Sequence, residues 1–276
     1  MPEKWLKEKI FQLPDLSVRR SGQMGAKVID LYIANIKALS DPKLFLKYYK
    51  KIDVVRQEKV RQCKQEMDKK RSILAGYLIQ EGVREIQFRE SGLQADAKPL
   101  SLTYTFGDNG KPYLKEYPKI HFNLSHSGEY VLCALSGEEV GTDIQKYKPG
   151  MRKVAERFFA EEEKRMIDLA AKRGARNVDE LFCRMWSIKE AYVKLTGSGL
   201  SQGMDGFHLQ FEENSPEGDH LEGGHYGQGI IFDMEKQGKS SYFRSSSFSY
   251  GEEKYSIAVC SYGEIADIKI KEVILA

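Results

Sequence analysis

The chain has 276 residues, of which 41% are hydrophobic and 30% charged, as expected for a globular protein with one large or two small cores. A formal net charge of +3 suits an anionic ligand but falls well short of a nucleic-acid-binding domain. Neither a secretory signal pattern nor an apolar run of membrane-spanning length occurs, so we expect a cytoplasmic protein that binds no membrane and no nucleic acid. No metal-binding spacing links the four cysteines, which predicts free thiols in a reducing compartment.

The first third of the chain contains a predicted strand followed by a basic helical segment. Residues 1–26 are polar and basic, and we interpret them as an N-terminal extension. Residues 27–39 have the composition of a strand that opens the first sheet. Residues 41–80 are predicted to be helical. A solvated helix surface explains each cation of this segment alone, but as a group they could hold phosphates. The cations are Arg56, Lys59, Lys64, Lys69, Lys70 and Arg71.

Three short strands are predicted next, at residues 102–107, 120–124 and 130–135. A turn after the first presents Lys111 at its tip, where a single lysine is usually just solvated. A polar Ser-His-Ser-Gly segment interrupts the sequence between the other two strands, and this break would expose hydroxyls, N–H groups and the imidazole of His126. His126 is either a turn residue bonded to nearby backbone or a ligand-binding residue, and its location between core strands favours ligand binding.

The strand predicted at residues 140–145 places Gly141, Asp143 and Gln145 on one face. The two polar side chains would lie about 6–7 Å apart, close enough to converge on one hard cation. Gly141 would leave the adjacent surface open. The alternative is a half-exposed edge strand with its polar residues turned to solvent, and the residues alone weigh the two interpretations equally.

The helix predicted over residues 181–195 has two distinct faces. Apolar residues recur every three or four positions and form one stripe that would pack on a core, and Gly197 follows where a helix end favours a left-handed residue. The other face carries Trp186, Glu190 and Lys194. A surface ion pair would explain the two charges, but a large aromatic beside them favours the wall of a cleft. The apolar stripe consists of Leu181, Met185, Ile188, Tyr192 and Leu195.

Helices flanking this segment and a series of strands after it complete the second half. Helices are predicted at residues 152–159 and 160–172, the second opened by three glutamates that suit a helix N-terminus. Residues 212–229 are predicted to be a loop, whose His220 and His225 could bind a metal but are more commonly solvated. Both halves would then hold a long helix and a set of strands, which suggests a duplicated α+β unit. The strands are predicted at 207–211, 229–234, 241–250, 254–261 and 265–274.

Three segments together resemble the 4′-phosphopantetheinyl transferases of the larger, surfactin-synthetase-activating type. In chain order they are FNLSHSGEYVLCAL, VGTDIQKYKP followed by RFFAEEE, and WSIKEAYVKLTGSGL. The likeness extends from about residue 53 to residue 261. It implies an α+β fold of two similar halves related by a pseudo-two-fold axis. After the extension, the first half would be residues 27–137, and residues 138–276 would form a second half that carries the metal site.

The resemblance also implies the reaction and its partners. An enzyme of the holo-[acyl-carrier-protein] synthase type would transfer 4′-phosphopantetheine from coenzyme A to a serine of an acyl or peptidyl carrier protein, with Mg²⁺ as cofactor and 3′,5′-ADP as product. The carrier would serve fatty acid, polyketide or non-ribosomal peptide synthesis. A monomer is expected, because the cleft would be complete within one chain. The alternatives are a non-catalytic coenzyme A- or carrier-binding homologue and, on the basic 56–71 segment, a nucleic-acid-binding module.

Roles for individual residues follow from the same resemblance. Asp143, Gln145 and Glu190 would bind Mg²⁺, and Glu190 would also be the base for the carrier serine. Lys194 would stabilise or protonate the leaving group, and Glu163 would be a further acid near the metal. Where many members have a second acid, this chain has Gln145, whose amide oxygen or a water would complete the site. The residues that match coenzyme-binding positions are Lys111, Ser125, His126, Arg56, Lys59 and Ser72.

Overall fold

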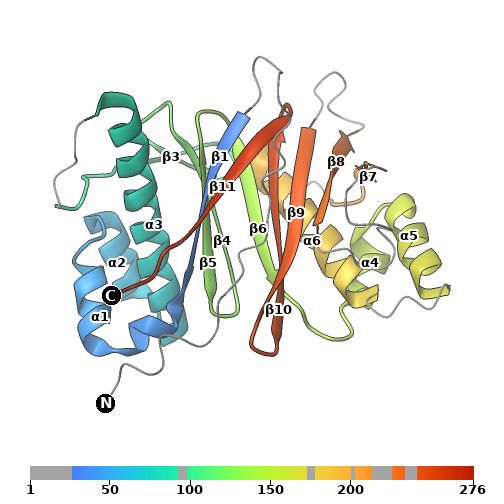
Figure 1. The fold of residues 1–276 in the computed structure, drawn as a ribbon, viewed down its shortest axis with the longest axis horizontal. Helices are drawn as coiled ribbons and strands as arrows, with labels where there is room; N and C mark the ends of the chain where they lie inside the picture. Colours follow the sequence, from blue (N-terminus) through green and yellow to red (C-terminus); the bar gives the residue numbers. More distant parts are fainter. Residues whose placement is uncertain (1–26, 93–97, 173–177, 200–202, 213–225, 234–240) are drawn as a thin grey trace.

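The computed structural model describes residues 27–92, 98–172, 178–199, 203–212, 226–233 and 241–276. Two β-sheets stand at the centre of the molecule, and helices cover them from both ends (Figure 1), which confirms the α+β class. Among the helices of the described ranges, none combines the length and hydrophobicity that a bilayer span needs. The predicted N-terminal extension and the loop histidines His220 and His225 lie outside the described residues.

The first sheet contains residues from both predicted halves. Its strand order is β11-β1-β5-β4, in which β1 pairs antiparallel with β5 and parallel with β11. The last described strand of the chain therefore lies beside the first. A separate hairpin joins β2 and β3. The strands are β1 (Lys27–Asn35), β2 (Tyr104–Phe106), β3 (Pro112–Leu114), β4 (His121–Ser127), β5 (Tyr130–Ser136) and β11 (Ile265–Glu272).

The second sheet is antiparallel throughout, with strand order β6-β10-β9-β8-β7. Strand β8 begins at Tyr226, three residues before its predicted start, while residues 213–225 of the predicted loop lie outside the described residues. The strands are β6 (Val140–Lys146), β7 (Phe207–Phe211), β8 (Tyr226–Asp233), β9 (Ser241–Tyr250) and β10 (Glu253–Tyr262).

In the first half of the chain, the number and bounds of the helices differ from the prediction. The segment predicted to be helical over residues 41–80 contains three helices: the Asp41 and Asp53 side chains each accept a backbone N–H and begin the first two, and the third begins after Gln65, which forms no side-chain cap. The third helix continues to Ser91, and Gly92 ends it with a φ of 68°. The helices are the 3-10 helix η2 (Ile36–Ser40) and the α-helices α1 (Pro42–Tyr49), α2 (Val54–Gln62), α3 (Glu66–Ser91), α4 (Arg152–Phe158), α5 (Glu161–Lys172) and α6 (Val178–Thr196).

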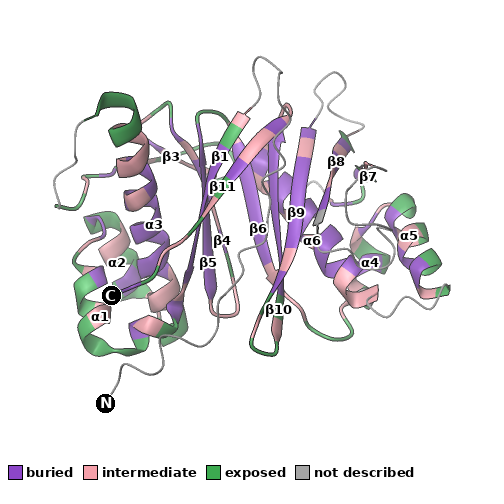
Figure 2. Ribbon diagram, in the orientation of Figure 1, coloured by how far each residue is buried: buried purple, intermediate pink, exposed green. Residues whose placement is uncertain are grey.

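Three hydrophobic clusters build the core, and the central strands and much of α3 and α6 consist of buried residues (Figure 2). Helix α3 packs on the first sheet, where Leu78 belongs to the same cluster as Cys133. Helix α6 packs on the second sheet, where Ile188 belongs to the same cluster as Ala258. The third cluster lies between the sheets. The layers are therefore helix, sheet, sheet and helix. The third cluster includes Leu31, Leu132, Ile144, Ile257 and Ile268.

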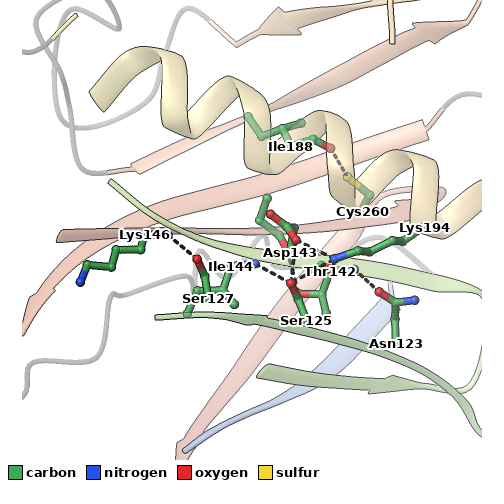
Figure 3. Close-up of polar contacts among 11 residues, drawn as sticks. Asn123, Ser125, Ser127, Thr142, Asp143, Ile144, Lys146, Ile188, Lys194 and Cys260 are labelled. Carbon is green, nitrogen blue, oxygen red and sulfur yellow. Dashed lines mark hydrogen bonds and ion pairs between the residues drawn. The ribbon is translucent and has the colours of Figure 1, made fainter. Parts of the chain in front are cut away.

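Side chains rather than a backbone ladder join the two sheets where their edge strands β4 and β6 meet (Figure 3). Three alternate residues of β4 each accept a hydrogen bond from the backbone N–H of an alternate residue of β6. We call this row of bonds the seam. The predicted break at residues 125–128 is therefore wrong: residues 125–127 continue β4, and the turn comes at Gly128, with a φ of 55°. The seam bonds join Thr142 to Asn123 at 3.0 Å, Ile144 to Ser125 at 3.2 Å and Lys146 to Ser127 at 2.9 Å.

Candidate active site

Helix α6 lies directly on strand β6, as its sequence requires. All five residues of the predicted apolar stripe are buried, and Gly197 follows the helix with a φ of 68°. A Cβ atom at Gly141 would lie 2.0 Å from the Ala191 carbonyl oxygen and 2.5 Å from the Leu195 nitrogen. The prediction that Gly141 leaves an open surface is wrong, because α6 fills that space. The missing side chain lets the polar face of α6 approach Asp143.

Asp143 is 5% exposed and uses only one of its carboxylate oxygens in hydrogen bonds. Oδ1 accepts from the Ser125 hydroxyl at 2.6 Å and from the Lys194 ammonium at 2.6 Å (Figure 3). Lys194 also donates to Ser125 Oγ at 3.0 Å and to the Thr142 carbonyl at 3.3 Å. Oδ2 is buried and has no hydrogen-bond partner in the described residues. A buried carboxylate oxygen without a partner is costly, so this atom marks a place for a further donor or a cation.

Glu190 lies one helical turn before Lys194 and lines the same hollow as Asp143. Its carboxylate forms no hydrogen bond or ion pair with another residue of the described ranges. Burial raises the pKa of Glu190, the negative charge of Asp143 raises this pKa further, and Lys194 lowers it. A cation beside both carboxylates would offset the repulsion that raises the pKa of Glu190.

The hollow beside these side chains has a volume of about 360 Å³ and also receives Gln145. The Gln145 amide nitrogen donates to the Lys146 carbonyl at 3.0 Å, which leaves its amide oxygen as an acceptor. Trp186 forms part of the wall, as predicted, and its ring stacks on Phe159 at a centroid distance of 6.2 Å. The structure therefore brings together Asp143, Gln145, Glu190 and Lys194. In the part of the chain that the structure describes, no cluster of three or more His, Cys, Asp or Glu residues could hold a metal by itself.

A second, larger hollow of about 660 Å³ lies next to the first, and Leu124, Ser125 and His126 line both. Its remaining wall comes mainly from α2, α3 and the β2–β3 hairpin. Two buried polar atoms on α3, Arg71 Nε and Ser72 Oγ, have no partner among the described residues. Anionic oxygens would satisfy both atoms. Its cationic and hydroxyl-bearing residues include Arg56, Lys59, Arg71, Ser72 and Tyr104.

Two residues of the larger hollow were not assigned to the site from the sequence. Arg71 was one of six similar cations, and it is distinguished by a bond from its guanidinium to the Gly128 carbonyl at 2.7 Å. Tyr104 donates to Asp53 at 3.0 Å, and the Arg56 guanidinium lies 5.4 Å from its ring centroid. These contacts link residues far apart in the chain, so no local sequence signal identifies them.

His126 lies on the wall common to both hollows, at an exposed position of β4. Although the residue reaches the surface, the protein atoms around its ring make desolvation the largest cause that lowers the pKa of His126, followed by the cations Arg71 and Lys194. The imidazole is therefore mainly neutral at pH 7 and can both donate and accept a hydrogen bond.

Lys111 is not brought to either hollow. Its ammonium forms an ion pair with Glu139 and donates to the Leu195 carbonyl at 2.9 Å. Burial lowers the pKa of Lys111, while Glu139 opposes that change. The carbonyl groups in the last turn of a helix lack partners within the helix, and Lys111 supplies one for α6. In this geometry Lys111 closes the C-terminal end of α6 rather than extending the phosphate-binding wall.

Glu163 is also separate from the site, in contrast to the expectation of an acid near the metal. It is fully buried and forms an ion pair with Lys189 at 3.2 Å. Its two oxygens accept the backbone N–H groups of Ala160 and Leu209, both at 2.8 Å. Because both oxygens are occupied inside the core, Glu163 joins α5 to β7 and α6 and does not line the hollow with Asp143.

Comparisons with known proteins identify the family. A sequence model described as the 4′-phosphopantetheinyl transferase superfamily matches residues 139–260. A 4′-phosphopantetheinyl transferase of Bacillus subtilis is 33% identical over 63% of this chain and 73% of its own length. The 4′-phosphopantetheinyl transferase Sfp of Bacillus subtilis strain 168 is 30% identical over 68% of this chain and 78% of its own length. The matched segment contains β6 and α6, so the resemblance read from the sequence is confirmed, and the chain belongs to the 4′-phosphopantetheinyl transferases of the Sfp type.

Proposed function

We propose that the chain transfers 4′-phosphopantetheine from coenzyme A to a serine of an acyl or peptidyl carrier protein and releases 3′,5′-ADP. Membership of the transferase family supports the reaction. The observation that carries the assignment of the site is the buried Oδ2 of Asp143 beside the carboxylate of Glu190, neither of which has a hydrogen-bond partner within the described ranges. This pair opens onto the wall that both hollows share, where an anionic substrate would pass from one to the other.

The side chains at the smaller hollow fit Mg²⁺. Asp143, Glu190 and Gln145 offer only oxygen ligands, which hard cations prefer, and Mg²⁺ is commonly held by one or two carboxylates together with substrate phosphates. A cation would also give the Asp143 Oδ2 atom the partner that it lacks. When bound, Mg²⁺ would neutralise charge that develops on the pyrophosphate during transfer.

The larger hollow would hold the anionic part of coenzyme A. Arg56, Lys59 and Arg71 supply positive charge, and the partnerless Ser72 hydroxyl and Arg71 Nε would bond to phosphate oxygens. His126, on the common wall, would contact the phosphates nearest the carboxylate pair. Lys111 would need to leave Glu139 and Leu195 to join these residues.

The chemistry assigned to the chain's own residues follows from this arrangement. The carrier serine oxygen would attack the phosphorus that bears pantetheine, and the bond from this phosphorus to 3′,5′-ADP would break. Glu190 has no hydrogen-bond or ion-pair partner among the described residues and would accept the serine proton. Lys194, fixed at 2.6 Å from Asp143 Oδ1, would place its positive charge near the departing phosphate.

We also propose how the whole chain is arranged. A long helix covers each sheet, which supports two similar halves, residues 27–137 and 138–276, about a pseudo-two-fold axis. We propose a monomer, since one chain supplies every residue assigned to the site. We also propose a cytoplasmic location and no nucleic-acid or membrane partner.

Intact-mass measurement of an apo carrier protein tests the function. The purified chain is incubated with coenzyme A, Mg²⁺ and a fatty-acid, polyketide or peptidyl carrier, with EDTA replacing Mg²⁺ in a parallel sample. We expect the carrier to gain one phosphopantetheine group, and EDTA to prevent the gain. Unchanged mass for all three carriers, from a protein that still binds coenzyme A, would favour the non-catalytic homologue instead.

A further inference from the structure

Ser125 stands where the seam, the carboxylate of Asp143 and the two hollows meet. We propose that Ser125 is a positioning residue that fixes Asp143 with its Oδ2 atom directed at the metal site, and that it is not a ligand of the coenzyme's phosphates. The inference rests on the proposed function, because it assumes a cation at Asp143.

The Ser125 hydroxyl already forms as many hydrogen bonds as it can. A serine hydroxyl has one proton to donate and two lone pairs that accept. Ser125 Oγ donates its proton to Asp143 Oδ1 at 2.6 Å, and it accepts from Ile144 N at 3.2 Å and from Lys194 Nζ at 3.0 Å. The residue is 7% exposed, and all three of its bonding positions are occupied. No proton remains for a phosphate oxygen, so the phosphate-binding role suggested by the sequence does not fit this geometry.

Only one of the two carboxylate oxygens of Asp143 stays free of partners among the described residues. Ser125 and Lys194 both bind Oδ1 of Asp143, so the carboxylate is held by one oxygen while Oδ2 keeps its lone pairs for a cation. The hydrogen bond from the Ile144 N–H holds the Ser125 hydroxyl in place. Ile144 directly follows Asp143 on β6, so the hydroxyl is held beside the Asp143 carboxylate. If the Lys194 ammonium turns toward a leaving phosphate, Ser125 still holds Oδ1. Groups that orient a metal ligand in this way commonly affect metal affinity 10- to 100-fold, roughly.

The chain supplies a matched control two residues further along β4. Ser127 is the next residue of the seam, and its Oγ accepts the Lys146 N–H at 2.9 Å. Its bonds do not include Asp143 or Lys194, and it lines neither hollow. Ser125→Ala and Ser127→Ala therefore each remove one seam bond, but only the first removes a contact of the metal site. Ser125→Thr keeps the hydroxyl and serves as the conservative variant.

The test compares metal and coenzyme binding for the full chain and these three variants. Mn²⁺ replaces Mg²⁺, and free Mn²⁺ is measured by electron paramagnetic resonance with coenzyme A present. Coenzyme A binding is measured separately by calorimetry in EDTA. We expect Ser125→Ala to raise the Kd for Mn²⁺ about ten-fold and to leave the Kd for coenzyme A in EDTA unchanged. Ser127→Ala should change neither value, and Ser125→Thr should restore most of the Mn²⁺ affinity.

The opposite pattern overturns the inference. If Ser125→Ala weakens coenzyme A binding in EDTA while Mn²⁺ binding matches that of Ser127→Ala, Ser125 is a phosphate ligand. If all variants bind Mn²⁺ like the unaltered chain and transfer continues, positioning by Ser125 is wrong and the proposed function stands. If the unaltered chain transfers without any metal and binds no Mn²⁺, both the inference and the metal site fail. A Ser125-dependent Mn²⁺ site in a chain that modifies no carrier would support the positioning role and overturn only the reaction.

Discussion

At the scale of single residues, the site depends on a carboxylate that is bound on one side and free on the other. Asp143→Asn keeps the size of the side chain and removes the charge that faces Lys194 and Glu190. We expect a folded protein whose transfer rate falls about 100-fold or more, because the weaker ligand no longer holds the cation. Circular dichroism and the carrier-mass assay measure the two properties. The control is Asp108→Asn in an exposed turn, and similar rates for both variants would contradict the assignment.

A second prediction at this scale concerns Glu139, which pairs with Lys111 at the end of α6. Burial alone would raise the pKa of Glu139, but the bonds to His121 and Lys111 outweigh it and lower the pKa to about 2. A carboxyl whose pKa is lowered by folding stabilises the protein above the pKa of the unfolded chain, near 4.5, and this contribution is lost as the pH falls toward 2.

Glu139→Gln should therefore lower the free energy of unfolding at pH 7 by about 2 kcal/mol, after allowing for the partial exposure of the pair. Urea denaturation at pH 7, 5 and 3 measures the difference, which should shrink steadily between the last two values. Glu90→Gln is the control, because Glu90 lies at an exposed position of α3 and its carboxylate forms no ion pair or hydrogen bond with another described residue. A difference that is constant with pH would show that the ionised form of Glu139 has no favourable interaction.

The residues of the site were only partly predictable, and the reason is the range of their contacts. Helical periodicity places Glu190 and Lys194 on one face of α6, and strand alternation places Asp143 and Gln145 on one face of β6, but only the family resemblance implied that these two faces meet. Lys111 has a conspicuous position in the sequence, but its partner Leu195 is 84 residues away, and nothing local predicts that bond. Arg71 looks like its neighbours until the Gly128 carbonyl, 57 residues away, is in place.

At the scale of elements, the contact of α6 with β6 sets the position of Glu190 and Lys194, the two side chains to which we assign proton transfer and charge stabilisation. Gly141→Ala would put a Cβ atom 2.0 Å from the Ala191 carbonyl, and backbone atoms cannot move aside as a flexible side chain can. We expect the variant to lose about 1–3 kcal/mol of stability, and transfer to fall as α6 shifts with Glu190. Gly137→Ala is the matched control, because nothing lies within 4 Å of its added carbon. Equal stability of the two variants in urea would show that α6 is not held at this distance.

The buried ion pair beneath α6 gives another prediction. The Lys189 ammonium also donates to the Met204 and Phe207 carbonyls, both at 2.7 Å, and burial lowers the pKa of Lys189 to about 8. Lys189→Met should destabilise the chain by about 3–5 kcal/mol, since it leaves Glu163 buried without its partner. Glu163→Gln added to it should recover part of this loss. A urea-denaturation cycle of the single and double variants gives the coupling energy, and strict additivity would contradict the pair.

Elements with their own signal were predicted well, and those that depend on a partner were not. Helix α6 and strand β5 follow from periodicity and an apolar run within the segment itself. Strand β4 continues through a Ser-His-Ser sequence that usually indicates a turn, because β6 supplies N–H groups for the alternate hydroxyls. The starts of α1 and α2 were available in the sequence, since Asp41 and Asp53 are typical residues to begin a helix, whereas α3 follows Gln65, which forms no side-chain cap.

At the scale of the whole molecule, β11 pairs with β1, so residues of the second predicted half complete the first sheet. The cluster between the sheets also takes residues from both, including Leu132 and Ile257. We therefore expect the two sheets to unfold as one cooperative unit. Native-state hydrogen exchange should give the same free energy of opening for the central amides of β5 and β10. A clearly lower value for one strand would show that the halves are independently stable.

The seam between β4 and β6 has a consequence for how such a protein changes over generations. Bonds between two backbones form whatever residues the strands carry, so substitutions rarely reach them. At this junction the side chains of Asn123, Ser125 and Ser127 accept the bonds. Each bond therefore depends on the identity of one residue, which one codon specifies. A single nucleotide change can remove one bond and leave the other two. The relative placement of the two sheets, and with it the distance between the larger hollow and the carboxylates of the smaller one, is thus directly accessible to selection.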